Sequence, residues 1–148
     1  MSRLPQVRFV LLIAALTLVL AGCGGSKKKA EVAPLSKEAA AACNGSRLSA
    51  APKLPTKWPD MAEVTLTQQS SQGPTQIVEG YFQGGIKAAH DDFKRELQGA
   101  GFTILFDELD AHDSEVSWKG QGRSGQVALR EECGRADKIY AKITNRPA

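Results

Sequence analysis

The sequence contains few of the residues from which catalytic centres are usually built. Its 148 residues include two histidines, and its three cysteines form no C-x-x-C pair. Ser124 lies in G-R-S-G, which lacks the G-x-S-x-G spacing of a nucleophile elbow. Catalysis usually needs a nucleophile or base beside a group that tunes it, and no such pair is visible along the chain, although folding can join distant residues. The sequence therefore predicts no catalytic residue, cofactor or metal, and favours a non-catalytic protein over an enzyme.

The sequence also lacks an apolar run long enough to cross a membrane. The run FVLLIAALTLVLA covers thirteen residues, 9–21, whereas a membrane span needs about 20. A signal-peptide core needs roughly 7–15 apolar residues, with positive charge before them and small residues after them. Arg3 and Arg8 precede the run, and Ala21 and Gly22 end it. We therefore expect residues 1–22 to be a signal peptide.

The residues around the expected cleavage point are Leu20, Ala21, Gly22 and Cys23. They resemble the lipobox of bacterial lipoproteins, with a favoured residue at every position. The resemblance implies that a diacylglycerol alkylates the Cys23 thiol, that the chain is cut just before Cys23, and that the acyl chains hold the protein on a bilayer. Gly24 is not the Asp that often retains this family at the inner membrane, so the implied location is the cell membrane or an outer membrane, with the domain outside the cytoplasm. The alternative is an ordinary signal peptide with an incidental cysteine.

Positive charge is concentrated near the N-terminus. The whole chain carries 19 Lys and Arg against 16 Asp and Glu, but residues 56–148 carry eleven bases and fourteen acids. Phosphate contacts need a concentrated basic surface, so this composition argues against a nucleic-acid partner. Residues 23–55 include GGSKKK and three prolines and are predicted to be a lipidated, flexible tether. Within it, KEAAAA, 37–42, could form a helical turn but is too short to be stable alone. Residues 56–148 are predicted to be one small domain.

Two cysteines, Cys43 and Cys133, remain when Cys23 is assigned to lipid. In the oxidising environment outside the cytoplasm, two remaining cysteines favour a disulfide. A bond between Cys43 and Cys133 would close a loop of about 90 residues. On the chain-entropy argument such a loop is worth about 4–5 kcal/mol, and it would fix the end of the tether to the domain. Two free thiols, a redox pair, or metal ligands that need further partners nearby are the alternatives.

Hydrophobic periodicity predicts six strands and one helix. Apolar residues recur at spacings of 3, 4, 4 and 3 from Ile86 to Ala100, which indicates one face of a helix. Alternating patterns predict strands near 64–67, 75–83, 102–106, 116–118, 127–129 and 139–143. The order is β-β-α-β-β-β-β, and short turns between the later strands indicate an antiparallel meander. We therefore expect an α+β fold with one helix packed on one face of the sheet.

Three features of the predicted domain offer candidate binding sites. The sheet face away from the helix would be either solvated or a docking surface. DELDAHDSE, 107–115, could gather calcium but more simply forms a solvated hairpin tip. GQGRSG, 120–125, matches G-x-G-x-x-G, but a strand-like segment follows it, whereas a dinucleotide site needs a helix there. The possible binding face would carry Lys119, Arg130, Tyr140 and Lys142.

These observations together indicate a lipid-anchored bacterial envelope protein with a small binding or accessory domain. The segment from Gly80 to Phe102 resembles the centre of small envelope lipoproteins of unassigned function, which implies no ligand. The expected partners are the membrane, through lipid on Cys23, and an envelope protein or polymer. The alternatives are an envelope hydrolase or redox enzyme, which predicts a pocket with converging titratable groups, and a structural subunit of an envelope complex, which predicts an exposed apolar patch.

Overall fold

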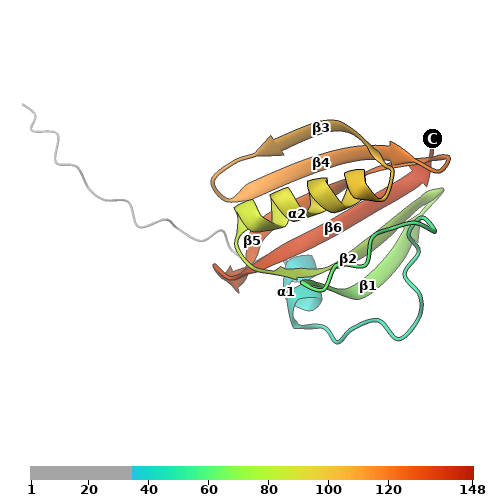
Figure 1. Cartoon of the computed structure of the whole chain (residues 1–148). Coiled ribbons are helices and arrows are strands. Elements are labelled where there is room, and N and C mark those ends of the chain that lie inside the picture. The colour runs from blue at the N-terminus through green and yellow to red at the C-terminus, as the bar shows by residue number, and fades with distance from the viewer. Residues whose placement is uncertain (1–34) are drawn as a thin grey trace, which may run out of the picture. The chain divides into compact units, whose positions relative to one another are not determined.

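The computed structural model describes residues 35–148, so the predicted signal peptide, the lipobox with Cys23 and the start of the predicted tether lie outside the described residues. Six strands form one antiparallel sheet in the order β1-β2-β6-β5-β4-β3, with two helices (Figure 1). This confirms the predicted α+β class and the six-stranded antiparallel sheet. The elements are α1 (Lys37–Asn44), β1 (Val64–Gln72), β2 (Thr75–Gln83), α2 (Ile86–Gly99), β3 (Thr103–Leu109), β4 (Asp113–Gly120), β5 (Arg123–Arg135) and β6 (Lys138–Pro147).

The four later strands form a meander that ends in the middle of the sheet. Strands β3 to β6 each pair with the next, and β6 then pairs with β2. The glycine-rich segment 120–125 is the hairpin between β4 and β5. Gln121 and Gly122 have φ angles of 54° and 69°, which suit a two-residue hairpin turn, and a Cβ at Gly125 would lie 1.9 Å from the Thr144 carbonyl oxygen. Turn geometry and close packing therefore account for these glycines.

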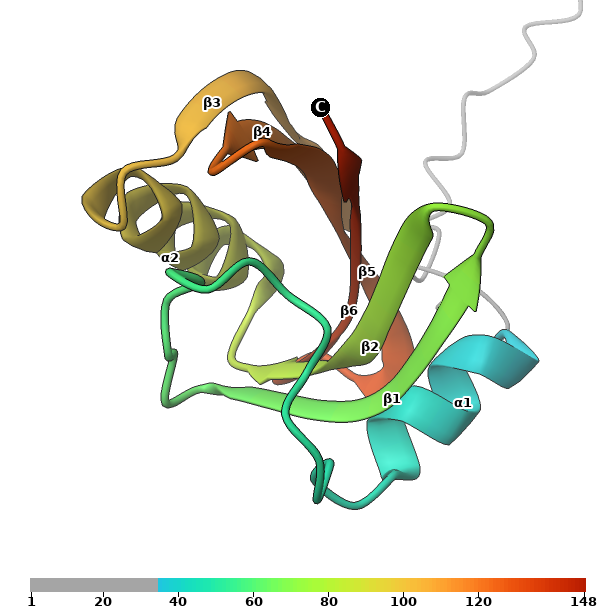
Figure 2. The same ribbon diagram turned by 90° about the vertical axis from the view of Figure 1, so that its right-hand side faces the viewer.

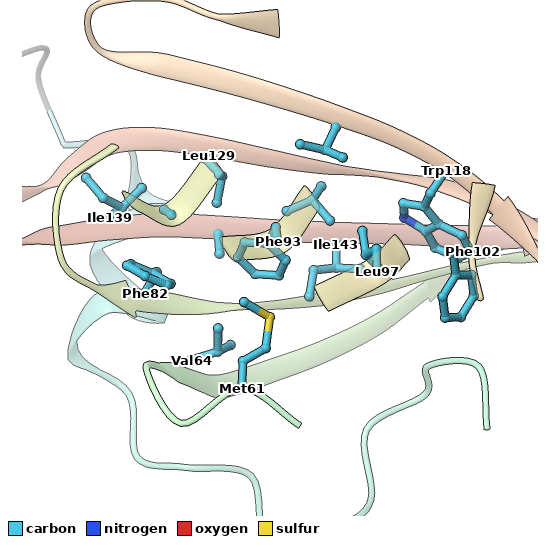
Figure 3. Close-up of a cluster of buried hydrophobic side chains, with 14 residues drawn as sticks. Met61, Val64, Phe82, Phe93, Leu97, Phe102, Trp118, Leu129, Ile139 and Ile143 are labelled. Atoms are coloured by element: carbon cyan, nitrogen blue, oxygen red, sulfur yellow. The ribbon is translucent and has the colours of Figure 1, made fainter. Parts of the chain in front are cut away.

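Helix α2 covers one face of the sheet through the stripe of residues that the spacing predicts. Ala89, Phe93 and Leu97 are all completely buried. Figure 3 shows the resulting cluster, which extends from Phe82 and Ile139 at one end to Trp118 and Phe102 at the other. This core packs α2 against the strands and fixes one face of the sheet.

The prediction of a single helix on a single face is wrong, because α1 packs on the opposite face (Figure 2). Ser36 caps α1 by accepting a hydrogen bond from the Ala39 amide at 3.1 Å. Ala39 and Ala42 are completely buried, and they pack with Tyr140 of β6. A disulfide joins Cys43, in the last turn of α1, to a strand, with 5.5 Å between the Cα atoms. Burial and this crosslink supply the stability that an isolated eight-residue helix lacks.

The disulfide joins Cys43 to Cys133, as the count of cysteines predicts. It attaches α1 to β5, which lies in the middle of the sheet.

Neither helix within residues 35–148 has the length and apolar character needed to cross a membrane.

The segment between α1 and β1, 45–63, passes around the edge of the sheet from the α1 face to the α2 face (Figure 2). The Leu48 amide donates to the Leu66 carbonyl of β1 at 2.8 Å, and Trp58 reaches the core cluster. Residues 35–55 therefore belong to the folded domain, whereas the sequence predicted a flexible tether as far as residue 55. Residues 35–148 contain the whole sheet, both helices, the disulfide and both apolar clusters, so the fragment Glu31–Ala148 keeps every described contact of the domain and is suited to experiments in solution.

Candidate ligand-binding pocket

A cavity of about 390 Å³ lies between segment 45–63 and the edge strand β1. We call it the loop pocket. Cavities of this size fall within the range of small-molecule sites in proteins. Its wall is mainly apolar, and Arg47, Thr56 and Asp60 add polar groups. The remaining lining residues are Leu48, Ala50, Pro52, Leu54, Pro55, Trp58, Pro59, Met61, Val64 and Leu66.

Prolines and one aromatic anchor hold the wall of the loop pocket away from β1. Pro52, Pro55 and Pro59 have fixed φ angles and no amide hydrogen, which keeps this short segment from joining the sheet as a further strand. Trp58 packs edge-on against Trp118, with 5.1 Å between the ring centroids, and against Phe102 at 5.8 Å. The loop is therefore anchored to the core near its middle, and a hollow remains between the anchor and the edge strand.

The four residues of the predicted binding face lie on the sheet face opposite α2, but internal contacts engage three of them. Tyr140 is only 5% exposed beneath α1, and its hydroxyl donates to a buried carboxylate. Burial, together with that carboxylate, raises the pKa of Tyr140 above its usual range. Lys142 lies 3.6 Å from Glu38 of α1, and Arg130 forms ion pairs on β4. Lys119 is exposed, so the structure does not bring the four together as one open surface.

The acidic stretch 107–115 forms β-strand ends and a hairpin, with its charges partly paired. Lys94 donates to Asp107 at 2.7 Å, and this contact is the main reason that the pKa of Asp107 lies below its ordinary value. Arg130 pairs with Glu115 at 3.1 Å. Across residues 35–148, no group of three or more His, Cys, Asp or Glu side chains is placed to hold a metal ion.

The structure joins three polar residues that the sequence reasoning did not connect. His90 of α2 has its Nδ1 at 2.7 Å from the Ser114 hydroxyl of β4 and its Nε2 at 3.4 Å from Asp107 of β3. The set has the composition of a nucleophile, a base and an orienting acid. Ser114 and His90 are only 2% and 5% exposed, however, so a substrate could reach the hydroxyl only if α2 moved away. We interpret the set as a polar contact that fastens α2 to the sheet.

The alternation of side chains along β4 could have predicted the contact between Ser114 and His90. Ser114 is in phase with Val116 and Trp118, both of which are completely buried beneath α2. That phase places the Ser114 hydroxyl on the helix-facing side of β4. His90 directly follows Ala89, a member of the apolar helix stripe, so the two side chains could have been predicted to meet.

Replacing Ser114 with alanine should therefore destabilise the domain. The His90 ring would lose its buried partner, which should cost about 1–3 kcal/mol in the free energy of unfolding measured with urea. Ser117→Ala is the matched control, since Ser117 lies on the same strand but on the opposite face, and it should change stability by no more than about 0.5 kcal/mol. Equal effects of the two substitutions would show that the contact adds no stability.

The edge strand β3 carries three of the four large apolar side chains that are exposed among the described residues, the fourth being Leu35. Leu105, Phe106 and Leu109 are 55%, 52% and 39% exposed. A register shift between Ile104 and Phe106 interrupts the pairing of β3 with β4, and irregularities of this kind are typical of protected edges. Phe106 pairs with Ser117 and Leu109 with Ser114, which lie on opposite faces of the sheet, so these side chains line the edge from both faces. An exposed apolar edge of this kind is a feature that a subunit of a larger complex would present.

No family model, no curated protein and no solved structure matches this chain.

Proposed function

We propose that the protein is held on the bacterial envelope by lipid on Cys23 and that its domain, outside the cytoplasm, is a non-catalytic module whose loop pocket binds an alkyl chain. The observation that carries the binding proposal is the loop pocket, a concave and largely apolar cavity of about 390 Å³. Burying one methylene group stabilises a complex by about 0.8 kcal/mol, so a short chain in this cavity gains several kcal/mol. A lipid anchor would place the pocket near a bilayer, where alkyl chains are abundant.

The residues around the pocket support binding rather than catalysis. Arg47, Thr56 and Asp60 are its polar groups, and the Arg47 guanidinium already donates to the Val64 carbonyl at 3.4 Å. The set contains no histidine, cysteine or serine. Few polar groups on an apolar wall are typical of sites that orient a ligand.

Filling the loop pocket should weaken alkyl binding. Octanol, titrated into the fragment Glu31–Ala148 by calorimetry, should bind at one saturable site. Ala50 is exposed and lines the pocket, so Ala50→Phe should place a ring in the cavity and raise the Kd about tenfold or more. Ala51 is exposed but outside the lining, and Ala51→Phe is the matched control that should leave the Kd unchanged.

Two results of this titration would contradict the proposal. One is that octanol fails to bind the wild-type fragment at a saturable site. The other is that Ala50→Phe and Ala51→Phe bind octanol equally well. Thermal unfolding of both variants serves as the folding control.

A structural subunit of an envelope complex is the second candidate function, because the apolar edge formed by Leu105, Phe106 and Leu109 could dock a partner. The two candidates place the functional surface on opposite edges of the sheet, since β1 borders the loop pocket and β3 lies at the other end of the strand order. Substitutions at one edge can therefore be tested without altering the other.

A further inference from the structure

A second cavity, of about 470 Å³, adjoins the loop pocket and is predominantly polar. We call it the polar pocket. Leu54, Pro55 and Thr56 line both cavities, so this short segment forms a wall that the two share. The other lining residues are Lys53 of segment 45–63, Pro74 of the β1–β2 turn, Gln76 of β2, Gln121 of the β4–β5 turn, Arg123 at the start of β5 and Asn145 near the end of β6.

The buried side-chain amide of Asn145 orients the guanidinium of Arg123 in the polar pocket. Asn145 is 1% exposed, and its Oδ1 accepts a hydrogen bond from Arg123 Nε at 2.6 Å. Its Nδ2 donates to the Lys53 carbonyl at 2.9 Å. One side chain therefore orients the guanidinium and also holds the backbone that carries Lys53. One terminal nitrogen of Arg123, Nη2, also donates to the Asn145 carbonyl at 3.4 Å. The other terminal nitrogen, Nη1, has no hydrogen-bond partner within the described residues and can donate to a ligand.

The charge in the polar pocket is of one sign. Its lining includes Arg123 and Lys53 but no aspartate or glutamate. Within residues 35–148, neither cation lies within 4.0 Å of a carboxylate, whereas Arg95, Arg130 and Arg135 all form ion pairs. Cations in a concave site, without acidic partners, attract anions more strongly than cations on a flat surface.

The β4–β5 turn ties the polar pocket to segment 45–63. Gln121 is the non-glycine residue with positive φ in the described part of the chain, and its side-chain oxygen accepts from the Lys57 amide at 3.2 Å. The contact holds the shared wall in place between the two cavities.

We propose that the natural ligand is an anionic amphiphile, with its alkyl chain in the loop pocket and its phosphate or carboxylate head group at Arg123 and Lys53. The ligand passes from one cavity to the other beside Thr56, which is exposed and lines both cavities. This inference rests on the proposed function, because it extends the alkyl site to an adjoining head-group site.

Three probes test the inference on the fragment Glu31–Ala148: octanol, octyl phosphate and inorganic phosphate. Octyl phosphate should bind about tenfold more tightly than octanol, since hydrogen bonds to charged groups are the stronger class. Arg123→Gln and Lys53→Gln should each reduce that preference, and Arg123→Lys should keep part of it. Lys57→Gln is the matched control, because Lys57 is exposed and lies outside the lining. Added salt should weaken octyl phosphate binding and leave octanol binding unchanged.

The outcomes separate this inference from the proposed function. Equal Kd values for octanol and octyl phosphate would overturn the anionic head group while leaving the alkyl site intact. Binding of inorganic phosphate as tight as that of octyl phosphate would show a site for free anions and overturn the amphiphile. Failure of both octyl probes would overturn the two proposals together. Lys53→Gln keeps the test decisive if Arg123→Gln disturbs the buried Asn145, because the Lys53 side chain is exposed.

Discussion

Replacing Cys43 and Cys133 together with alanine should lower the free energy of unfolding by about 4–5 kcal/mol. The bond spans 90 positions of sequence, so its removal frees a long loop in the unfolded chain. Equilibrium urea unfolding of the oxidised wild-type and variant fragments Glu31–Ala148 measures the difference. A loss below about 1 kcal/mol would show that the crosslink adds little to the domain.

The effect should be concentrated in α1. This helix has eight residues, its buried side chains are small, and helices of that length are marginal in water. Its other attachments to the sheet include packing against Tyr140 and three polar contacts. The Lys138 ammonium contacts the Cys43 carbonyl, the Thr67 hydroxyl donates to the Ala42 carbonyl at 2.8 Å, and Lys142 lies 3.6 Å from Glu38. Hydrogen exchange should therefore accelerate in α1 far more than in α2, which remains packed in the main core. Uniform acceleration would contradict this account.

Replacing Cys23 with serine should release the protein from the membrane or leave its leader uncut. Serine has no thiol for the expected transfer of diacylglycerol, and the remaining apolar run of thirteen residues is short for a span. Membrane fractionation and intact-mass analysis provide the measurement. The wild-type chain should begin at Cys23 and be heavier by a diacylglyceryl group.

The variant with Cys43 and Cys133 both changed to alanine is the control for anchoring. It loses the disulfide but keeps Cys23, so it should stay in the membrane fraction. The Cys23→Ser variant should show the reverse, with the disulfide retained and the anchor lost. A wild-type protein of unmodified mass in that fraction would rule out the lipoprotein proposal.

The sequence predicted the parts of the fold whose side chains alternate in size and polarity. The stripe of α2 and the strands around Val116, Val127 and Ile143 carry large apolar residues at regular intervals, and these became the main core. For α1 the sequence indicated only a helical turn at 37–42 and not a helix packed on the sheet, because the buried face of α1 is made mainly of alanine, which adds little to a hydrophobic pattern. Its stability comes from a disulfide to a residue 90 positions away, and no local pattern shows such a contact.

The loop pocket was missed because its wall resembles a linker. Prolines at 52, 55 and 59 indicate an extended segment, and the sequence does not show which surface such a segment covers. The wall of the pocket is held in place by Trp58, whose ring packs against Trp118, sixty positions later in the sequence.

The acidic residues of the stretch 107–115 were visible in the sequence, but their pairing with Lys94 and Arg130 depends on the order of the strands.

The most direct test of the account is a crystal structure of the fragment Glu31–Ala148 soaked with a bromine-labelled octanol. Anomalous scattering locates the bromine independently of the protein. We expect one main peak inside the loop pocket, close to Trp58 and Met61, and its loss in Ala50→Phe. A main peak on the β3 edge at Leu105 and Phe106, or no peak within the loop pocket, would contradict the proposed function.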